Sequence, residues 1–205
     1  MSPTEVGALP SLVLASGSPR RRELLGTLGL EFEVRPPNVP ESPHPGETPE
    51  GYVRRLSREK AAAVGTAGEL VIAADTIVVV DDEVLEKPVD NAEAASMLRR
   101  LQGREHRVLT GVSVRDVSAA GLVTDHGESL VHMRPMIDDE ITWYVATGEP
   151  ADKAGSYALQ GIGAIFVAGV TGSSSNVIGL PLALVYVLFA SIGHDLKAYS
   201  AEPGE

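Results

Sequence analysis

Two ionisable residues stand where the surrounding pattern predicts burial. Asp75 lies inside "LVIAADTIVVV", residues 70–80, a run of otherwise uncharged residues rich in β-branched side chains. Lys60 falls near the middle of the apolar stripe of a helix predicted over residues 49–64. A buried unpaired charge is costly, so each group needs an opposite charge or hydrogen bonds. Both also have a structural interpretation, in which Asp75 caps a turn at a strand end and the Lys60 ammonium reaches water at the core edge.

Three consecutive arginines form a second unusual group. Arg20, Arg21 and Arg22 follow Ser18-Pro19 in "SGSPRRRELL", where a helix is predicted to begin. Helix N-termini carry partial positive charge, so cations destabilise that end unless an anion binds there. Arginines in this place can add bidentate contacts to a phosphate. The alternative is that the side chains point into solvent, which suits Arg22 best.

Lys87, in "LEKP", is a further cation whose role depends on strand pairing. Asp81-Asp82 predicts a turn after the strand over residues 70–80, and a shorter strand follows. If the two strands pair, Lys87 returns to within reach of Asp75. Without that pairing it is an ordinary surface lysine.

The elements that must position these groups follow from periodicity and end signals. Helix caps are expected at Thr48 and Asn91, and glycines close several helices. Predicted strands cover residues 12–15, the region near 32, 70–80, a short segment ending at 88, 107–114, 122–133 and 163–170; predicted helices cover 19–28, 49–64, 92–101, 138–147 and an apolar C-terminal segment. Strands and helices alternate along the first part of the chain, and paired strands follow. This order indicates an α/β fold with a mixed twisted sheet and flanking helices.

The overall composition narrows the function classes. The chain has 205 residues, a formal net charge of −11 and no cysteine. The negative charge argues against nonspecific binding to nucleic acid or anionic membranes, and the missing cysteines exclude disulfides and thiol catalysis. The five histidines show no metal-ligand spacing. No signal peptide pattern is present at the N-terminus, so a cytoplasmic location is expected.

Residues 176–193, "NVIGLPLALVYVLFASIG", carry no charge and approach the length of a membrane span. Gly179 and Pro181 near the start, and the lack of a flanking basic cluster, favour a buried core helix instead. The residues alone therefore predict an α/β protein that gathers basic groups for a polyanion beside a carboxylate. Phosphate-ester or phosphoanhydride chemistry is the class this favours.

Six segments in order resemble the signature blocks of the Maf family of nucleoside triphosphate pyrophosphatases: "LASGSPRRRELL", "YVRRLSREKA", "AADTIVVVDDEVLEKP", "LTGVSV", "YVATGEPADKAGSYALQGIGAIFV" and "SNVIGLPL". The resemblance spans about residues 12–190. It implies the inosine triphosphatase-like (Maf/Ham1) fold, with two lobes around a cleft. It also implies hydrolysis of a nucleoside triphosphate to the monophosphate and pyrophosphate, with Mg²⁺ or Mn²⁺ as cofactor.

The resemblance also implies roles for individual residues. Asp75 matches the family's catalytic aspartate, described as a proton acceptor, and with Glu41 it is expected to bind the metal. The loop here reads "VPES", with Pro40 where the family commonly has an acidic residue. Metal binding is therefore expected to use fewer carboxylates.

The remaining matched positions concern the substrate. Arg21, Lys60 and Lys87 match residues that contact phosphate, and Ser16 lies in the same binding loop. Arg20, Thr76 and Gln160 match the branch that acts on dTTP and UTP, with CTP and modified pyrimidine nucleotides as further possible substrates.

The expected organisation is a single two-lobed domain over residues 11–195 between tails at 1–10 and 196–205. A homodimer is expected from the family. The competing hypothesis is a nucleotide-binding regulator of cell division or septum formation that does not turn its ligand over.

Overall fold

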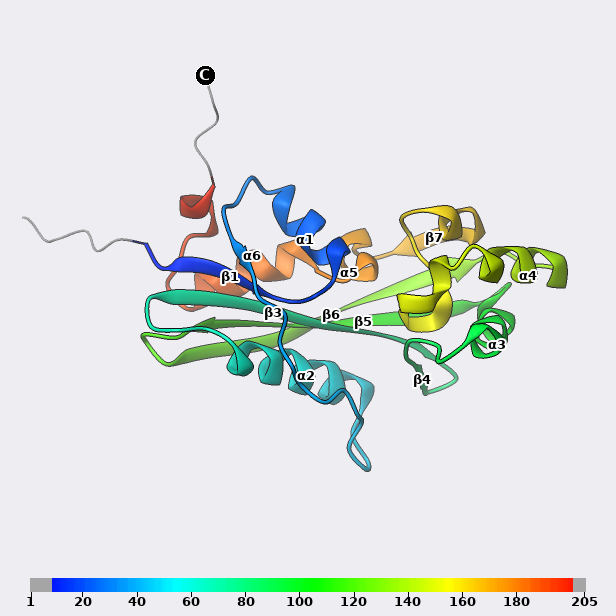
Figure 1. Ribbon diagram of the computed structural model, residues 1–205, viewed down its shortest axis with the longest axis horizontal. Helices are drawn as coiled ribbons and strands as arrows, with labels where there is room; N and C mark the ends of the chain where they lie inside the picture. The colour runs from blue at the N-terminus through cyan, green and yellow to red at the C-terminus, as the bar shows by residue number, and fades with distance from the viewer. Residues whose placement is uncertain (1–8, 201–205) are drawn as a thin grey trace, which may run out of the picture.

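The apolar runs predicted as strands pair into one twisted sheet within residues 9–200, the part of the chain that the computed structural model describes (Figure 1). The strands are β1 (Ser11–Ala15), β2 (Glu33–Val34), β3 (Glu69–Val80), β4 (Glu83–Leu85), β5 (Glu105–Asp116), β6 (Gly121–Met133) and β7 (Val167–Thr171). Their order is β2-β1-β3-β5-β6-β7, with β4 also on β3. β1 runs parallel to β2 and β3, and the other pairs are antiparallel. The predicted mixed α/β sheet is confirmed.

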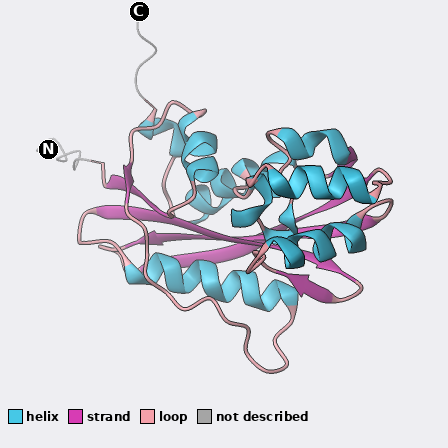
Figure 2. Ribbon diagram, turned by 45° about the vertical axis from the view of Figure 1, so that its right-hand side comes forward, coloured by secondary structure: helices cyan, strands magenta, loops and turns pink. Residues whose placement is uncertain are grey.

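Helices cover both faces of this sheet (Figures 1 and 2). They are α1 (Pro19–Gly26), α2 (Pro49–Ala63), α3 (Asn91–Leu101), α4 (Asp138–Ala146), α5 (Ser174–Ile178) and α6 (Leu182–Ser191), with short 3₁₀ helices η1 (Glu149–Asp152), η2 (Ala154–Ser156), η3 (Ile162–Phe166) and η4 (Leu196–Tyr199). Figure 1 shows α2 below the sheet and α1, α5 and α6 above it.

Alternation along β3 distributes its side chains between the two faces. Leu70, Ile72 and Ala74 pack in one core with α1 and α6, whereas Val78 and Val80 pack in another with α3 and α4. Both sets lie on the same face, because side chains two residues apart point the same way. The two cores at the two ends of the long strands are the two expected lobes, and α2 covers the opposite face.

Three local predictions were wrong in detail. The cap of α3 is Asp90, whose carboxylate accepts from the Glu93 amide at 2.8 Å, so Asn91 is the first helical residue. The predicted strand over 163–170 begins later, because residues 162–166 form η3. The apolar segment 176–193 is two helices, broken at Gly179, whose φ of 128° suits only glycine.

The prediction of a core helix within residues 176–193 is confirmed for the side of α6 that faces the sheet, since Val185 and Phe189 are fully buried. Among the described residues, no helix has both the length and the apolar character needed to cross a membrane.

The predicted tails lie partly outside the described residues, which exclude 1–8 and 201–205. Residues 196–200 still pack on the domain: Leu196 is buried and Ser200 forms a bridge with Leu30. The proposed domain boundary at 195 stays a prediction.

Candidate active site

A gap along one edge of β3 creates the site. β1 pairs with β3 from Ser11↔Glu69 to Ala15↔Ala73, and β4 pairs with it only from Val78 onward. Residues 74–77 of β3 therefore have β5 on one edge and no partner strand on the other within the described chain. Asp75 and Thr76 occupy this gap and point to opposite faces of the sheet.

A cavity of about 530 Å³ opens at this gap. All the residues for which the sequence predicts a role line it: Ser16, Arg20, Arg21, Glu41, Lys60, Asp75, Thr76, Lys87 and Gln160. They come from the β1–α1 loop, α1, the loop between β2 and α2, α2, β3, the segment after β4 and the segment after η2. Residues spread over 145 positions of sequence are thus brought to one place.

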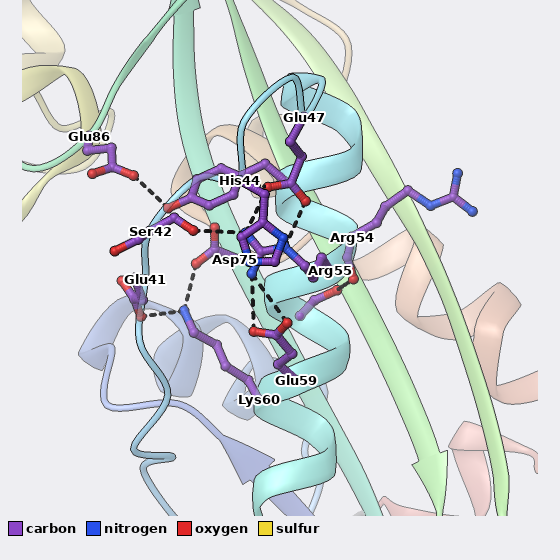
Figure 3. Close-up of polar contacts among 12 residues, drawn as sticks. Glu41, Ser42, His44, Glu47, Arg54, Arg55, Glu59, Lys60, Asp75 and Glu86 are labelled. Carbon is purple, nitrogen blue, oxygen red and sulfur yellow. Dashed lines mark hydrogen bonds and ion pairs between the residues drawn. The ribbon is translucent and has the colours of Figure 1, made fainter.

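The Asp75 side of the cavity holds an ion triad. Lys60 Nζ lies 2.6 Å from Asp75 Oδ1 and 2.6 Å from Glu41 Oε1 (Figure 3). The Lys60 and Asp75 side chains are only 7% and 9% exposed. Lys60 therefore does not reach bulk water, and Asp75 pairs with a cation rather than capping a turn, so both structural interpretations were wrong.

Glu41 reaches this triad because its loop is attached to α2. Arg55 donates to both carboxylate oxygens of Glu47, at 2.7 Å each, and to the carbonyl of Ser42 at 2.9 Å (Figure 3). Burial alone would favour the neutral form of Glu41, but the Lys60 hydrogen bond and the charges of Lys60 and Lys87 keep its pKa below the ordinary value. Asp75 and Glu41 are the carboxylate pair here that could hold a metal.

The Thr76 side of the cavity holds Arg21. Its guanidinium donates to the carbonyl of Gly179 at 2.7 Å, to Thr76 Oγ1 at 3.0 Å and to Ser16 Oγ at 3.4 Å. All three acceptors are neutral. Burial lowers the pKa of Arg21, against the opposing effect of the Asp75 and Glu41 charges. Within residues 9–200 Arg21 forms no ion pair, so its charge is available to an anion.

The other cations differ in their surroundings. Arg20 pairs with Asp152 at 3.1 Å across the cavity mouth, and Arg22 is exposed, as expected. The β3–β4 turn has φ of 52° at Asp81 and 60° at Asp82, which is the two-residue hairpin geometry that matches strand twist. The predicted pairing is thus confirmed, and it returns the exposed Lys87 to the cavity.

Several contributors were missed by sequence reasoning. Arg55 lies opposite the apolar stripe of its helix, where periodicity predicts a solvated side chain, but it is the residue that attaches the Glu41 loop. Tyr52 lies on the apolar stripe and is buried, and in addition its hydroxyl donates to Glu86 Oε1 at 2.6 Å, with both residues lining the cavity. Burial and the Glu86 carboxylate raise the pKa of Tyr52. Periodicity marks only which side of a helix is apolar, so neither contact could be found that way.

Comparison with known proteins identifies the family of this chain. The family model described as "Maf-like protein" matches residues 11–192. A dTTP/UTP pyrophosphatase of Anaeromyxobacter sp. (strain Fw109-5) is 55% identical over 188 residues, covering 90% of this chain and 91% of the relative. Proteins of the same name from Myxococcus xanthus and Geobacter sulfurreducens are 49% and 48% identical, covering 90% and 89% of this chain and 94% and 96% of the relatives.

Among solved structures, the Staphylococcus aureus Ham1 protein aligns with 60% of this chain and 71% of its own, at 16% identity and a TM-score of 0.38. The family match and the identities to relatives along nearly their whole length are sufficient on their own: this chain belongs to the Maf family.

Proposed function

We propose that this protein is a nucleoside triphosphate pyrophosphatase that converts dTTP and UTP to the monophosphate and pyrophosphate. The observation that carries the proposal is that one cavity holds two cationic side chains, Lys60 and Arg21, in different surroundings. Lys60 joins two carboxylates, and Arg21 beside them is held by neutral acceptors alone. The names of the relatives, dTTP/UTP pyrophosphatase, support the same substrates.

The carboxylate pair suits a divalent cation. Asp75 and Glu41 already direct oxygens to one cationic atom, Lys60 Nζ, at 2.6 Å each. Mg²⁺ needs only one or two protein carboxylates, because phosphate oxygens and water complete its shell. Asp75 and Glu41 would hold Mg²⁺ or Mn²⁺, which when bound supplies positive charge to the phosphoryl oxygens. Within the described residues no group of three or more acidic or histidine side chains offers a fuller site.

The cationic side chains then bind the triphosphate. Arg21, with Ser16 beside it, contacts phosphate oxygens through the N–H groups that the protein leaves unused. Lys87 adds a charge from the segment after β4, and Lys60 keeps a donor free for a phosphate oxygen because two of its three protons serve Asp75 and Glu41. Positioning and charge stabilisation of this kind account for most of the catalysis of phosphoryl transfer.

Asp75 acts as the general base. Oδ1 accepts from Lys60, which fixes the carboxylate, and Oδ2 accepts a proton from a water in the cavity. The oxygen of that water attacks the α-phosphorus, the bond from this phosphorus to the bridging α–β oxygen breaks, and pyrophosphate leaves with the bond electrons. Arg20, Thr76 and Gln160 select the pyrimidine base in this proposal.

A cytoplasmic location and a homodimer complete the proposal. Analytical ultracentrifugation of the purified chain tests the second point, since a monomer at micromolar concentration would contradict it.

The decisive experiment measures pyrophosphate release from dTTP, UTP and GTP in Mg²⁺, for the wild type and Asp75→Asn. We expect release from the pyrimidine nucleotides and a loss of about a thousandfold in kcat for the variant, the range of a lost general base. Asp116→Asn is the matched control, because Asp116 is also a buried strand carboxylate with a side-chain partner, His194 Nε2 at 2.9 Å, but away from the cavity. Binding without pyrophosphate release would contradict the proposal, and undiminished turnover by Asp75→Asn would remove Asp75 from it.

A further inference from the structure

Behind the cavity wall, a chain of hydrogen bonds runs from Arg21 into the protein. Arg21 Nη2 lies 3.0 Å from Thr76 Oγ1, which lies 2.9 Å from Thr110 Oγ1, which lies 2.9 Å from the carbonyl oxygen of Asn176. Thr76 and Thr110 are directly opposite each other in the β3–β5 register. Thr110 is completely buried and does not line the cavity, so it cannot touch a ligand there.

Counting protons fixes the direction of this chain. A carbonyl oxygen only accepts, so Thr110 must donate its single hydroxyl proton to Asn176. Thr110 can then only accept from Thr76, and Thr76 must donate to it. Thr76 can then only accept a hydrogen bond from Arg21. A guanidinium can only donate, so this is the partner it needs. Only one assignment of the Thr76 and Thr110 hydroxyl protons therefore makes all three contacts hydrogen bonds.

The same count shows what Arg21 has left for a ligand. A guanidinium has five N–H donors, and Gly179, Ser16 and Thr76 accept three of them. One N–H remains on each terminal nitrogen, the pair suited to a bidentate phosphate contact. Losing the Thr76 contact would free Arg21 to rotate, so that ordering it would cost free energy on every binding event.

We propose that Thr110 is a positioning residue for the triphosphate site: it orients the Thr76 hydroxyl as an acceptor and thereby holds Arg21 in its phosphate-binding geometry. The inference rests on the proposed function for its substrate class, nucleoside triphosphates. Because this series of hydrogen bonds ends at Arg21, Thr110 affects the affinity for the phosphates and leaves the chemical step unchanged.

The test uses inorganic tripolyphosphate as a probe without a base, with binding measured by titration calorimetry. Thr110→Val keeps the side-chain shape but removes the hydroxyl, and we expect about tenfold weaker binding from the loss of a hydrogen bond to a charged group. Thr110→Ser restores the hydroxyl and should bind within about twofold of the wild type. Thr110→Cys provides a second replacement without the hydroxyl if the valine variant does not fold.

Ser113→Ala is the matched control for simple destabilisation. Ser113 lies on the same strand, is fully buried, and bonds Ser57 at 3.0 Å and Thr124 at 2.7 Å without lining the cavity. It should lower Tm without changing tripolyphosphate affinity. Equal affinity of Thr110→Val and wild type would overturn the inference, as would weakened binding by Ser113→Ala to the same degree.

A double-mutant cycle tests the route through Thr76. In the Thr76→Val background, Thr110→Val should cause no further loss of tripolyphosphate affinity, and additive losses would contradict the proposed chain. With dTTP, Thr110→Val should raise KM about tenfold at nearly constant kcat, as for a lost binding contact. If the wild type binds tripolyphosphate but releases no pyrophosphate from dTTP, the proposed function fails while the positioning role of Thr110 is still decided by the binding data.

Discussion

Asp75 and Thr76 are neighbours in β3, but they face opposite sides of the sheet and hold their cations in different ways. On the α2 side, Lys60 contacts two carboxylates, Asp75 and Glu41, so protein charges surround it and the triad carries a net negative charge. On the α1 side, Arg21 contacts a carbonyl and two hydroxyls, and among residues 9–200 no anion lies within hydrogen-bond distance of it.

The difference shows how a chain with net charge −11 can bind a polyanion. Neutral acceptors fix the direction of the Arg21 guanidinium without an ion pair, so in our proposal an incoming phosphate meets a partly desolvated charge that its contact partners do not neutralise. The carboxylates on the other face are suited to proton transfer and to a divalent cation. One strand therefore places the Arg21 guanidinium and the two carboxylates on opposite faces of the sheet.

Breaking the α2 side should have the largest effect on stability. Lys60→Met leaves Asp75 buried without its cation, and removing one partner of a buried pair costs about 3 kcal/mol. Urea unfolding measures this loss. Lys197→Met is the control, because that lysine is 72% exposed in its pair with Asp195 and its removal should cost less than about 1 kcal/mol.

The same variant sharpens the metal assignment. With the ammonium gone, Mg²⁺ or Mn²⁺ no longer competes with it for Asp75 and Glu41, so the cation should raise Tm more in Lys60→Met than in the wild type. A smaller rise in the variant would show that these carboxylates do not bind the metal.

Breaking the α1 side should affect binding more than stability. Arg21→Ala removes the uncompensated charge, and we expect kcat/KM to fall about a hundredfold on every nucleotide, as for a charge-assisted bidentate contact. Arg22→Ala, one residue along the helix and exposed, should leave kcat/KM within about twofold because its side chain is solvated. An Arg21→Ala variant impaired on one base only would place Arg21 at the base instead of the phosphates.

Arg55→Ala tests how the α2 side is assembled. Removing this side chain frees the loop at Ser42 and Glu47, and Glu41 then loses its fixed position next to Lys60. We expect kcat/KM to fall about tenfold, the scale on which small misplacements of catalytic groups act. Arg58→Ala on the same helix is exposed and serves as the control. Raising the Mg²⁺ concentration should recover part of the Arg55→Ala loss, and no recovery would contradict a role through Glu41.

The extent to which sequence predicted this site also differs between the two faces. Asp75 and Lys60 stood out because each places a charge in an apolar pattern, and burial then forces them to pair. Their third partner, Glu41, came only from family resemblance, because loop residues carry no periodicity. Arg55 attaches this loop because the fourteen loop residues 35–48 follow a path that returns to α2. Local sequence pattern does not encode that path.

On the α1 side, the arginine run predicted an anion site, and only the family resemblance distinguished Arg21 as the phosphate contact. Thr76 and Thr110 are ordinary strand residues in sequence, and only the antiparallel register puts their hydroxyls opposite each other. The break between α5 and α6 that offers the Gly179 carbonyl to Arg21 was read as the start of one helix. Elements and charges were predictable, whereas partner atoms depend on tertiary packing.

The smallest effect is expected where the two lobes meet at the cavity mouth. Arg20 and Asp152 form an exposed pair at 3.1 Å, with side chains 26% and 61% exposed. Such pairs contribute less than about 1 kcal/mol, so Asp152→Asn should barely change Tm. It should, however, release Arg20, which we expect to contact the base. The ratio of kcat/KM for dTTP to that for GTP should then shift a few-fold, while tripolyphosphate affinity stays constant because Arg21 is untouched. The shift should be largest at low ionic strength, since salt screens exposed charges. A loss of tripolyphosphate binding in Asp152→Asn would instead put Arg20 with Arg21 on the phosphates and remove the distinction between the two arginines.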